Sequence, residues 1–154
     1  MISMFTPIKS LLLEDAVVAS MVTGAAGVRI HSDVIPQRGS VDSVLEIAGP
    51  TLVVQTMLVF SGRSSEGRTG IEVHRLQLDA YASSRELADN LLDAATLVLC
   101  PDPRYSKFSF RRVVNGVEIQ AVREDPTPGA PTYERDTRLY RRSLDFKVTA
   151  ARAA

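Results

Sequence analysis

The segment IEVHRLQLDAYA at residues 71–82 decides the fold, together with SSRELADNLL, which follows at 83–92. Apolar and polar side chains alternate through the first segment. One set of alternate positions holds His74, Leu76, Leu78 and Ala80, and the other holds Arg75, Gln77 and Asp79. A period of two predicts a strand with one face on a core and the other facing water or a partner.

A helix is expected directly after this strand, because the apolar positions then recur with helical spacing. Ser83 and Glu86 form a capping-box pattern at its start. Pro101 and Pro103 end the helix, since proline cannot continue one. The core-facing stripe of this helix comprises Leu87, Leu91, Leu92, Ala95 and Val98.

Upstream, the sequence predicts one helix and two strands. Thr6 followed by Pro7 is a good helix start, and helical spacing continues to Val22, where Gly24 and Gly27 stop it. Asp15 interrupts the apolar stripe and is expected to place its carboxylate in water. A short strand at Val28–His31 and a longer one at Thr51–Ser61 follow.

Downstream, the clearest local signal is a hairpin. Asn115-Gly116 joins two strand-like runs, Phe108–Val114 and Val117–Val122, and favours a type I′ turn. Residues 138–149 alternate again and predict a closing strand in which Arg142 takes an inward position. Residues 150–154 are expected to fray.

Two segments are predicted to be flexible loops. The first, at 62–70 (GRSSEGRTG), contains three glycines between two strands and carries Arg63, Glu66 and Arg68. We expect it to be mobile in the free subunit and to become ordered against a partner. The second, at 125–131, contains three prolines. The whole chain, 1–154, is then a single α+β domain with a mixed or antiparallel sheet and two helices packed on one face.

Composition argues against several classes of function. No apolar run approaches the ~20 residues that span a bilayer, so no membrane partner is expected. The single cysteine, Cys100, excludes an intrachain disulfide and follows an apolar run, which favours a buried, unreactive role. His31 and His74 have no Cys or His neighbours at metal-ligand spacing. We therefore expect no catalytic, metal or cofactor residues, and a protein that is not an enzyme.

The charge distribution suggests an interface instead. Residues 1–104 hold 8 Lys/Arg against 12 Asp/Glu, whereas residues 105–154 hold 10 against 6, so that a net −4 is balanced by +4. Opposite patches of this kind suit head-to-tail contact between identical subunits. Arg111, Arg112, Arg138 and Arg141 are candidate interface residues, for DNA phosphates or for acidic patches of neighbours. The alternative is a solvated face balanced by nearby acids.

Several segments together resemble the bacteriophage tail terminator (tail completion, head–tail joining) family. They are LLEDAVVASMV at 12–22, RIHSDVIPQ at 29–37, PTLVVQ at 50–55, RLQLDAYA at 75–82, ELADNLL at 86–92 and YRRSLDFKV at 140–148. Each motif is mainly strand or helix patterning, and their order carries the resemblance. Residues 39–48 and 111–132 do not match.

The resemblance implies a structural virion protein of the tail or neck, assembled in the host cytoplasm. Such a subunit forms a ring, expected to be a hexamer, at the head-proximal end of the tail tube. The ring ends tube polymerisation and joins the tail to the head connector or stopper protein, while DNA passes through without specific binding. The alternatives are another neck component, such as a connector or stopper, and a nucleic-acid-binding module.

Overall fold

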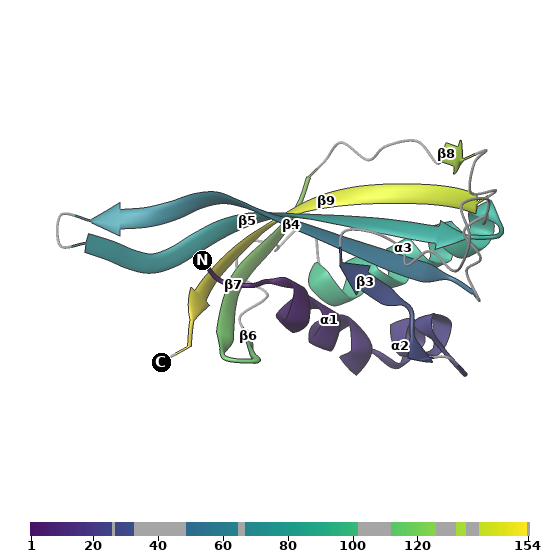
Figure 1. Ribbon diagram of the computed structural model, residues 1–154, viewed down its shortest axis with the longest axis horizontal. Coiled ribbons are helices and arrows are strands. Elements are labelled where there is room, and N and C mark those ends of the chain that lie inside the picture. The colour runs from purple at the N-terminus through teal and green to yellow at the C-terminus, as the bar shows by residue number, and fades with distance from the viewer. Residues whose placement is uncertain are drawn as a thin grey trace, which may run out of the picture.

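The computed structural model describes residues 1–25, 27–32, 49–64, 67–101, 112–125, 132–134 and 139–153 (Figure 1). The helices in these residues are α1 (Phe5–Glu14), α2 (Ala16–Val22) and α3 (Arg85–Leu99). The strands are β1 (Thr23–Gly24), β2 (Gly27–Val28), β3 (Ile30–Ser32), β4 (Thr51–Ser64), β5 (Gly67–Ala82), β6 (Arg112–Val114), β7 (Val117–Glu124), β8 (Thr132–Glu134) and β9 (Leu139–Arg152).

Seven of the described strands form one sheet in the order β3-β4-β5-β9-β7-β6, with β8 also paired to β9. β3 runs parallel to β4, and the other pairs are antiparallel. The described helices lie on one face of this sheet (Figure 1), where α1 contacts β4 and β6 and α3 contacts β5 and β9. The prediction of an α+β fold with a mixed sheet and helices on one face is confirmed.

The core lies between this helical layer and the inward face of the sheet. His74, Leu76, Leu78 and Ala80 are all at most 2% exposed, as the alternation in β5 predicted. In β9 the inward positions are Leu144, Phe146, Val148 and Ala150. They pack with helical residues that include Ile8, Leu11, Leu12, Leu91 and Leu92. Burial of this apolar surface is the main term that holds the two layers together.

The N-terminal helix differs from the prediction in two respects. It is broken at Asp15, whose carboxylate accepts hydrogen bonds from the backbone N–H groups of Val17 and Val18 and so caps α2. Asp15 is half-buried, as expected of a boundary position, but the prediction did not include its role as a cap. α1 begins at Phe5 with no side-chain cap, so Thr6 does not act as one. The described helices consequently number three, where two were predicted.

The helix after β5 is confirmed with a shifted start. Ser84, and not Ser83, is its N-cap, because the Ser84 Oγ accepts a hydrogen bond from the Leu87 N–H. The buried stripe is accordingly Ala88, Leu91, Leu92, Ala95 and Leu99. Leu87, which was predicted to face the core, is 38% exposed.

The glycine-rich segment at 62–70 is not a nine-residue loop. β4 continues to Ser64 and β5 resumes at Gly67, with Arg63 opposite Arg68 and Ser64 opposite Gly67. The glycines suggested a loop, but cross-strand backbone pairing compensates for their low strand propensity. The prediction for 125–131 falls, after Asp125, outside the described residues.

The C-terminal part of the chain confirms the hairpin and corrects the tail. Asn115 and Gly116 both have positive φ, +50° and +74°, as a type I′ turn between β6 and β7 requires. The described part of the first hairpin strand begins at Arg112. β9 runs through to Arg152 and Ala150 is fully buried, so residues 150–152 do not fray. Arg142 takes the predicted inward position, with its guanidinium 2.9 Å from Asp89 of α3.

Candidate assembly surfaces

The most prominent surface feature is an arm formed by the far halves of β4 and β5, which projects from the body of the protein (Figure 1). β9 pairs with β5 only from Ile71 onward, so Gly67 and Arg68 pair with β4 alone. Two irregularities interrupt the β4–β5 ladder near this departure from the main sheet: one extra residue of β4 at 58–60, and residues 69–71 of β5 opposite a single residue of β4. β-Bulges of this kind increase the local twist and bend the strand that carries them.

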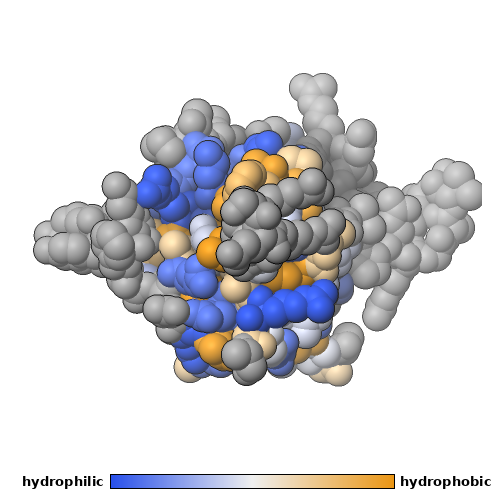
Figure 2. Space-filling model, turned by 90° about the vertical axis from the view of Figure 1, so that its left-hand side faces the viewer, coloured by the Kyte–Doolittle hydropathy of each residue, from blue (hydrophilic) through white to orange (hydrophobic). Residues whose placement is uncertain are grey.

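An apolar patch covers the root of the arm on the outer face of the sheet, the face opposite the helices. We define the arm patch as Met57, Phe60, Ile71 and Val73. Met57 and Phe60 are 56% and 57% exposed, and Ile71 is 38% exposed. Phe60 lies opposite Val73 and Met57 lies opposite Arg75, so the side chains share one face. Figure 2, which looks onto this end of the molecule, shows apolar surface beside strongly hydrophilic surface.

A row of cations crosses the sheet next to the arm patch. Arg75 of β5 lies opposite Lys147 of β9, and Lys147 lies opposite Arg123 of β7. Arg75 is ion-paired with Asp145, and this hydrogen bond and its charge raise the pKa of Arg75. Lys147 and Arg123 are exposed and form no ion pair with another described residue. Like charges directly opposite each other repel. The described acids beside this row are Asp145 and Asp125, whose charges both act on Arg75.

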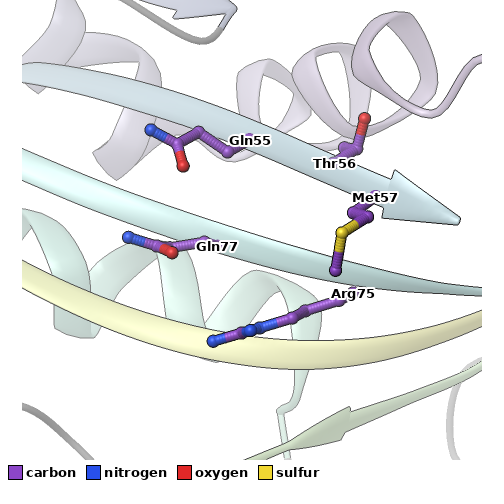
Figure 3. A pocket seen from close by; sticks show the side chains of 5 residues that line it. All are labelled: Gln55, Thr56, Met57, Arg75 and Gln77. Atoms are coloured by element: carbon purple, nitrogen blue, oxygen red, sulfur yellow. The ribbon is translucent and has the colours of Figure 1, made fainter. Parts of the chain in front are cut away.

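A shallow hollow of about 370 Å³ lies between the arm patch and this row. Its lining comprises Gln55, Thr56, Met57, Arg75 and Gln77. Figure 3 shows Gln55, Met57, Arg75 and Gln77 on the same side of β4 and β5, with the Arg75 side chain reaching across β9. These groups offer amide and guanidinium hydrogen bonds around a thioether but no nucleophile or general base. The hollow is suited to contacting a partner's side chains.

At the other end of the outer face, polar side chains form hydrogen bonds with one another. Asp79 is 1% exposed, although it was predicted to face water or a partner. Its carboxylate accepts hydrogen bonds from Gln77, Arg141 and Ser143, with Arg141 Nη2 at 3.2 Å. The Arg141 guanidinium also lies 5.9 Å from the centre of the Tyr81 ring. These contacts satisfy a carboxylate whose isolated burial would be costly.

A second buried acid lies on the inward face at the root of the arm. Glu72 accepts hydrogen bonds of 2.8 Å from the Ile2 N–H and from the His74 ring, and the Met1 amino group is 3.7 Å away. Burial alone would raise the pKa of Glu72, but these donors and the nearby charge lower it below its ordinary value. The acid thus ties the N-terminal segment to the base of the arm.

The helical layer has an exposed stripe of opposite charge. We define the α3 stripe as Glu86, Asp93 and Leu97, which follow one another at seven and four residues and so share a face of α3. Leu97 is 63% exposed. The Asp93 side chain is 67% exposed and lies 3.8 Å from Arg142 at its nearest. Glu86 is also exposed. Two acids and a leucine therefore lie along one surface of α3 that faces away from the core.

The sequence-predicted interface residues that the structure describes lie in different parts of the molecule. Arg63 and Arg68 are backbone partners in the arm, while Glu66, Arg111 and Arg138 lie outside the described residues.

Arg112 is ion-paired with Glu14 at the end of α1, and Arg141 is ion-paired with Asp79. Arg112 lies opposite Ile119 of β7, and Ile119 lies opposite Ala150 of β9. Ala150 is nine residues along β9 from Arg141. At about 3.3 Å per residue, they are roughly 30 Å apart.

Sequence reasoning missed Lys147, Arg123 and the arm patch. Alternation in β9 placed Lys147 on the polar face, but only the strand register shows that it meets Arg75 and Arg123. The arm patch was missed because its residues come from two strands on either side of the glycine-rich segment. Its one visible signal was apolar density in 57–60, which favoured a buried strand.

Comparison with known proteins defines the class of the chain. A family model described as tail completion protein gp17 matches residues 6–151. The chain belongs to this family, a class of structural phage tail proteins.

A chain in the virion of a native gene transfer agent (GTA) particle has the same fold. The TM-score is 0.63 at 15% identity, over 94% of this chain and 92% of that one. No curated protein matches.

Two kinds of feature are absent from the described residues. They contain no helix long and apolar enough to cross a membrane. They also contain no group of three or more His, Cys, Asp or Glu side chains arranged to hold a metal ion. Cys100 is buried at 3% exposure, as predicted from its apolar surroundings.

Proposed function

We propose that the protein forms a ring, a hexamer, at the head-proximal end of a phage tail tube. There it ends tube polymerisation and joins the tail to the head connector or stopper protein. The family match over residues 6–151 carries this proposal. The fold similarity to a chain of a gene transfer agent virion supports it at the level of architecture.

The surfaces of the subunit suit such a role. A ring needs a contact between two different patches on each copy, placed so that the rotation closes. The arm patch and the α3 stripe are two exposed patches of different chemistry on opposite layers of one domain. Interfaces of this kind combine an apolar centre with a charged rim. DNA would pass through the ring without specific binding, and assembly would take place in the host cytoplasm.

The proposal assigns the end of the arm to contacts with the tail tube or the connector. Arg63 and Arg68 lie opposite each other in its backbone ladder, and Glu66 falls between them in sequence. Hydrogen exchange tests this assignment. Residues 62–70 should be better protected in assembled tails than in the free ring, and equal protection would contradict a contact there.

Electron microscopy of the purified protein, with native mass spectrometry, tests the ring itself. We expect six-fold rings that bind one end of assembled tail tubes, and overlong tubes when tails assemble without the protein. Rings that bind heads in the absence of tails would instead indicate a connector or stopper. Tight, salt-sensitive binding to duplex DNA by a monomer would indicate a nucleic-acid-binding module.

A further inference from the structure

We propose that the outer face of the sheet in one copy binds helix α3 of the next copy. In this contact the arm patch packs against Leu97, and Lys147 and Arg123 pair with Glu86 and Asp93. The inference rests on the proposed ring and specifies which two surfaces close it. The occupant of the outer face is thus a second copy of this chain.

The first support is the chemistry of the outer face. Met57, Phe60 and Ile71 expose apolar side chains side by side on a sheet face that no described helix covers. Contiguous apolar surface of this kind is typical of an interaction site when polar residues border it. Lys147 and Arg123 form that border, one strand apart.

The second support is the charge of Lys147 and Arg123, which are exposed and form no ion pair with another described residue. The free subunit holds two cations opposite each other, although Arg75 beside them is already paired with Asp145. Acidic groups from outside would relieve the repulsion. The two opposed cations repel each other in the monomer, and a negatively charged surface laid against them would be attracted.

The third support is that the same chain carries a matching surface. The α3 stripe places two exposed acids and an exposed leucine on one helix face. Glu86 forms no ion pair with another described residue, and Asp93 reaches only Arg142, at 3.8 Å. The stripe lies on the layer opposite the outer face, so one copy cannot satisfy both surfaces itself. A head-to-tail contact between copies can.

Charge reversal tests this contact. Lys147→Glu should abolish the ring or weaken it at least tenfold, as measured by sedimentation equilibrium. The same change should leave the thermal midpoint of the isolated subunit at or above that of the wild type, because the introduced carboxylate would lie between Arg75 and Arg123. Arg152→Glu is the matched control. It reverses a charge on the same strand but on the opposite face, and should leave the ring intact.

A charge swap makes the test specific. Glu86→Lys with Asp93→Lys should also disrupt the ring, and combining these changes with Lys147→Glu and Arg123→Glu should restore it. Rings that persist in the Lys147→Glu variant would overturn the inference. If this variant still formed rings but no longer bound the tail tube or DNA, the outer face would be assigned to that partner. The inference would also be overturned if the variant with all four substitutions stayed monomeric, provided that the acidic-side and basic-side variants are each folded and monomeric. A wild type that never forms rings would refute the proposed function itself.

Discussion

Two acids on the outer face of the sheet, Asp79 of β5 and Asp145 of β9, contribute unequally to stability because their surroundings differ. Asp79 is 1% exposed and holds Gln77, Arg141 and Ser143 in one network. Asp145 pairs with Arg75 on the same face, but the Arg75 side chain is 51% exposed and Asp145 is 23% exposed. Water therefore screens the second pair and not the first.

Substitution of these two acids separates the effects of burial and of charge. Asp79→Ala should lower the free energy of unfolding by about 2–3 kcal/mol, because it leaves the Arg141 guanidinium without its carboxylate. Asp145→Ala should cost less than about 1 kcal/mol. Urea denaturation followed by circular dichroism measures both, and equal losses would contradict the difference in burial.

Glu72 makes the stability of the fold depend on pH. Its pKa in the folded protein is lowered from the ordinary value of 4.5. The stabilisation is therefore complete above pH 4.5 and is lost as pH falls through the lower, folded-state pKa. Glu72→Gln should flatten the dependence of the unfolding free energy on pH between about 5 and 3. A wild type and variant with parallel pH profiles would show that this acid is not coupled to folding.

At the scale of elements, local sequence rules placed the longer helices and strands but not all of their ends. The positive φ angles of both residues in the β6–β7 turn can be predicted from the Asn-Gly dipeptide alone. The cap of α3 does not, because Ser83 and Ser84 are both acceptable caps and packing against the sheet selects the register. Asp15 divides the predicted N-terminal helix into α1 and α2 by capping α2, a local role that the apolar spacing alone does not reveal.

The capping register of α3 can be tested with adjacent serines. Ser84→Ala should destabilise the protein by about 1 kcal/mol, because the Leu87 N–H loses its acceptor. Ser83→Ala should stay within about 0.5 kcal/mol of the wild type. Thermal unfolding of the two variants under identical conditions makes the comparison, and a larger effect at Ser83 would reverse the assignment.

At the scale of the whole molecule, the sequence predicted the layers but not the surface. Alternation and helical spacing contain enough information to place helices on one face of a mixed sheet. Which polar residues meet across strands depends on register, and register comes from pairings between segments far apart in the chain. Of the arginines predicted as one interface, Arg112 pairs with Glu14 and Arg141 pairs with Asp79, while Lys147 and Arg123 emerged only from the fold.

Assembly should respond differently to changes in the apolar and in the charged parts of the outer face. Phe60→Ser should leave the stability of the subunit within about 0.5 kcal/mol, since this side chain is 57% exposed, but should weaken oligomers at every salt concentration. Raising the ionic strength from about 0.1 M to about 1 M shortens the Debye length from ~10 to ~3 Å and should weaken wild-type oligomers. Sedimentation velocity across a salt series measures both, and salt-independent association would contradict a charged contact.

The way β5 is paired along its length has a mechanical consequence. From Ile71 to Ala82 the strand pairs with β9 without a register shift. Between this ladder and the arm, residues 69–71 lie between the β4–β5 pairs Ser61–Glu72 and Arg63–Arg68, and Gly70 has a φ of +76°. A sideways load on the arm should therefore bend the strand pair at this point, while the ladder beside the core stays in register.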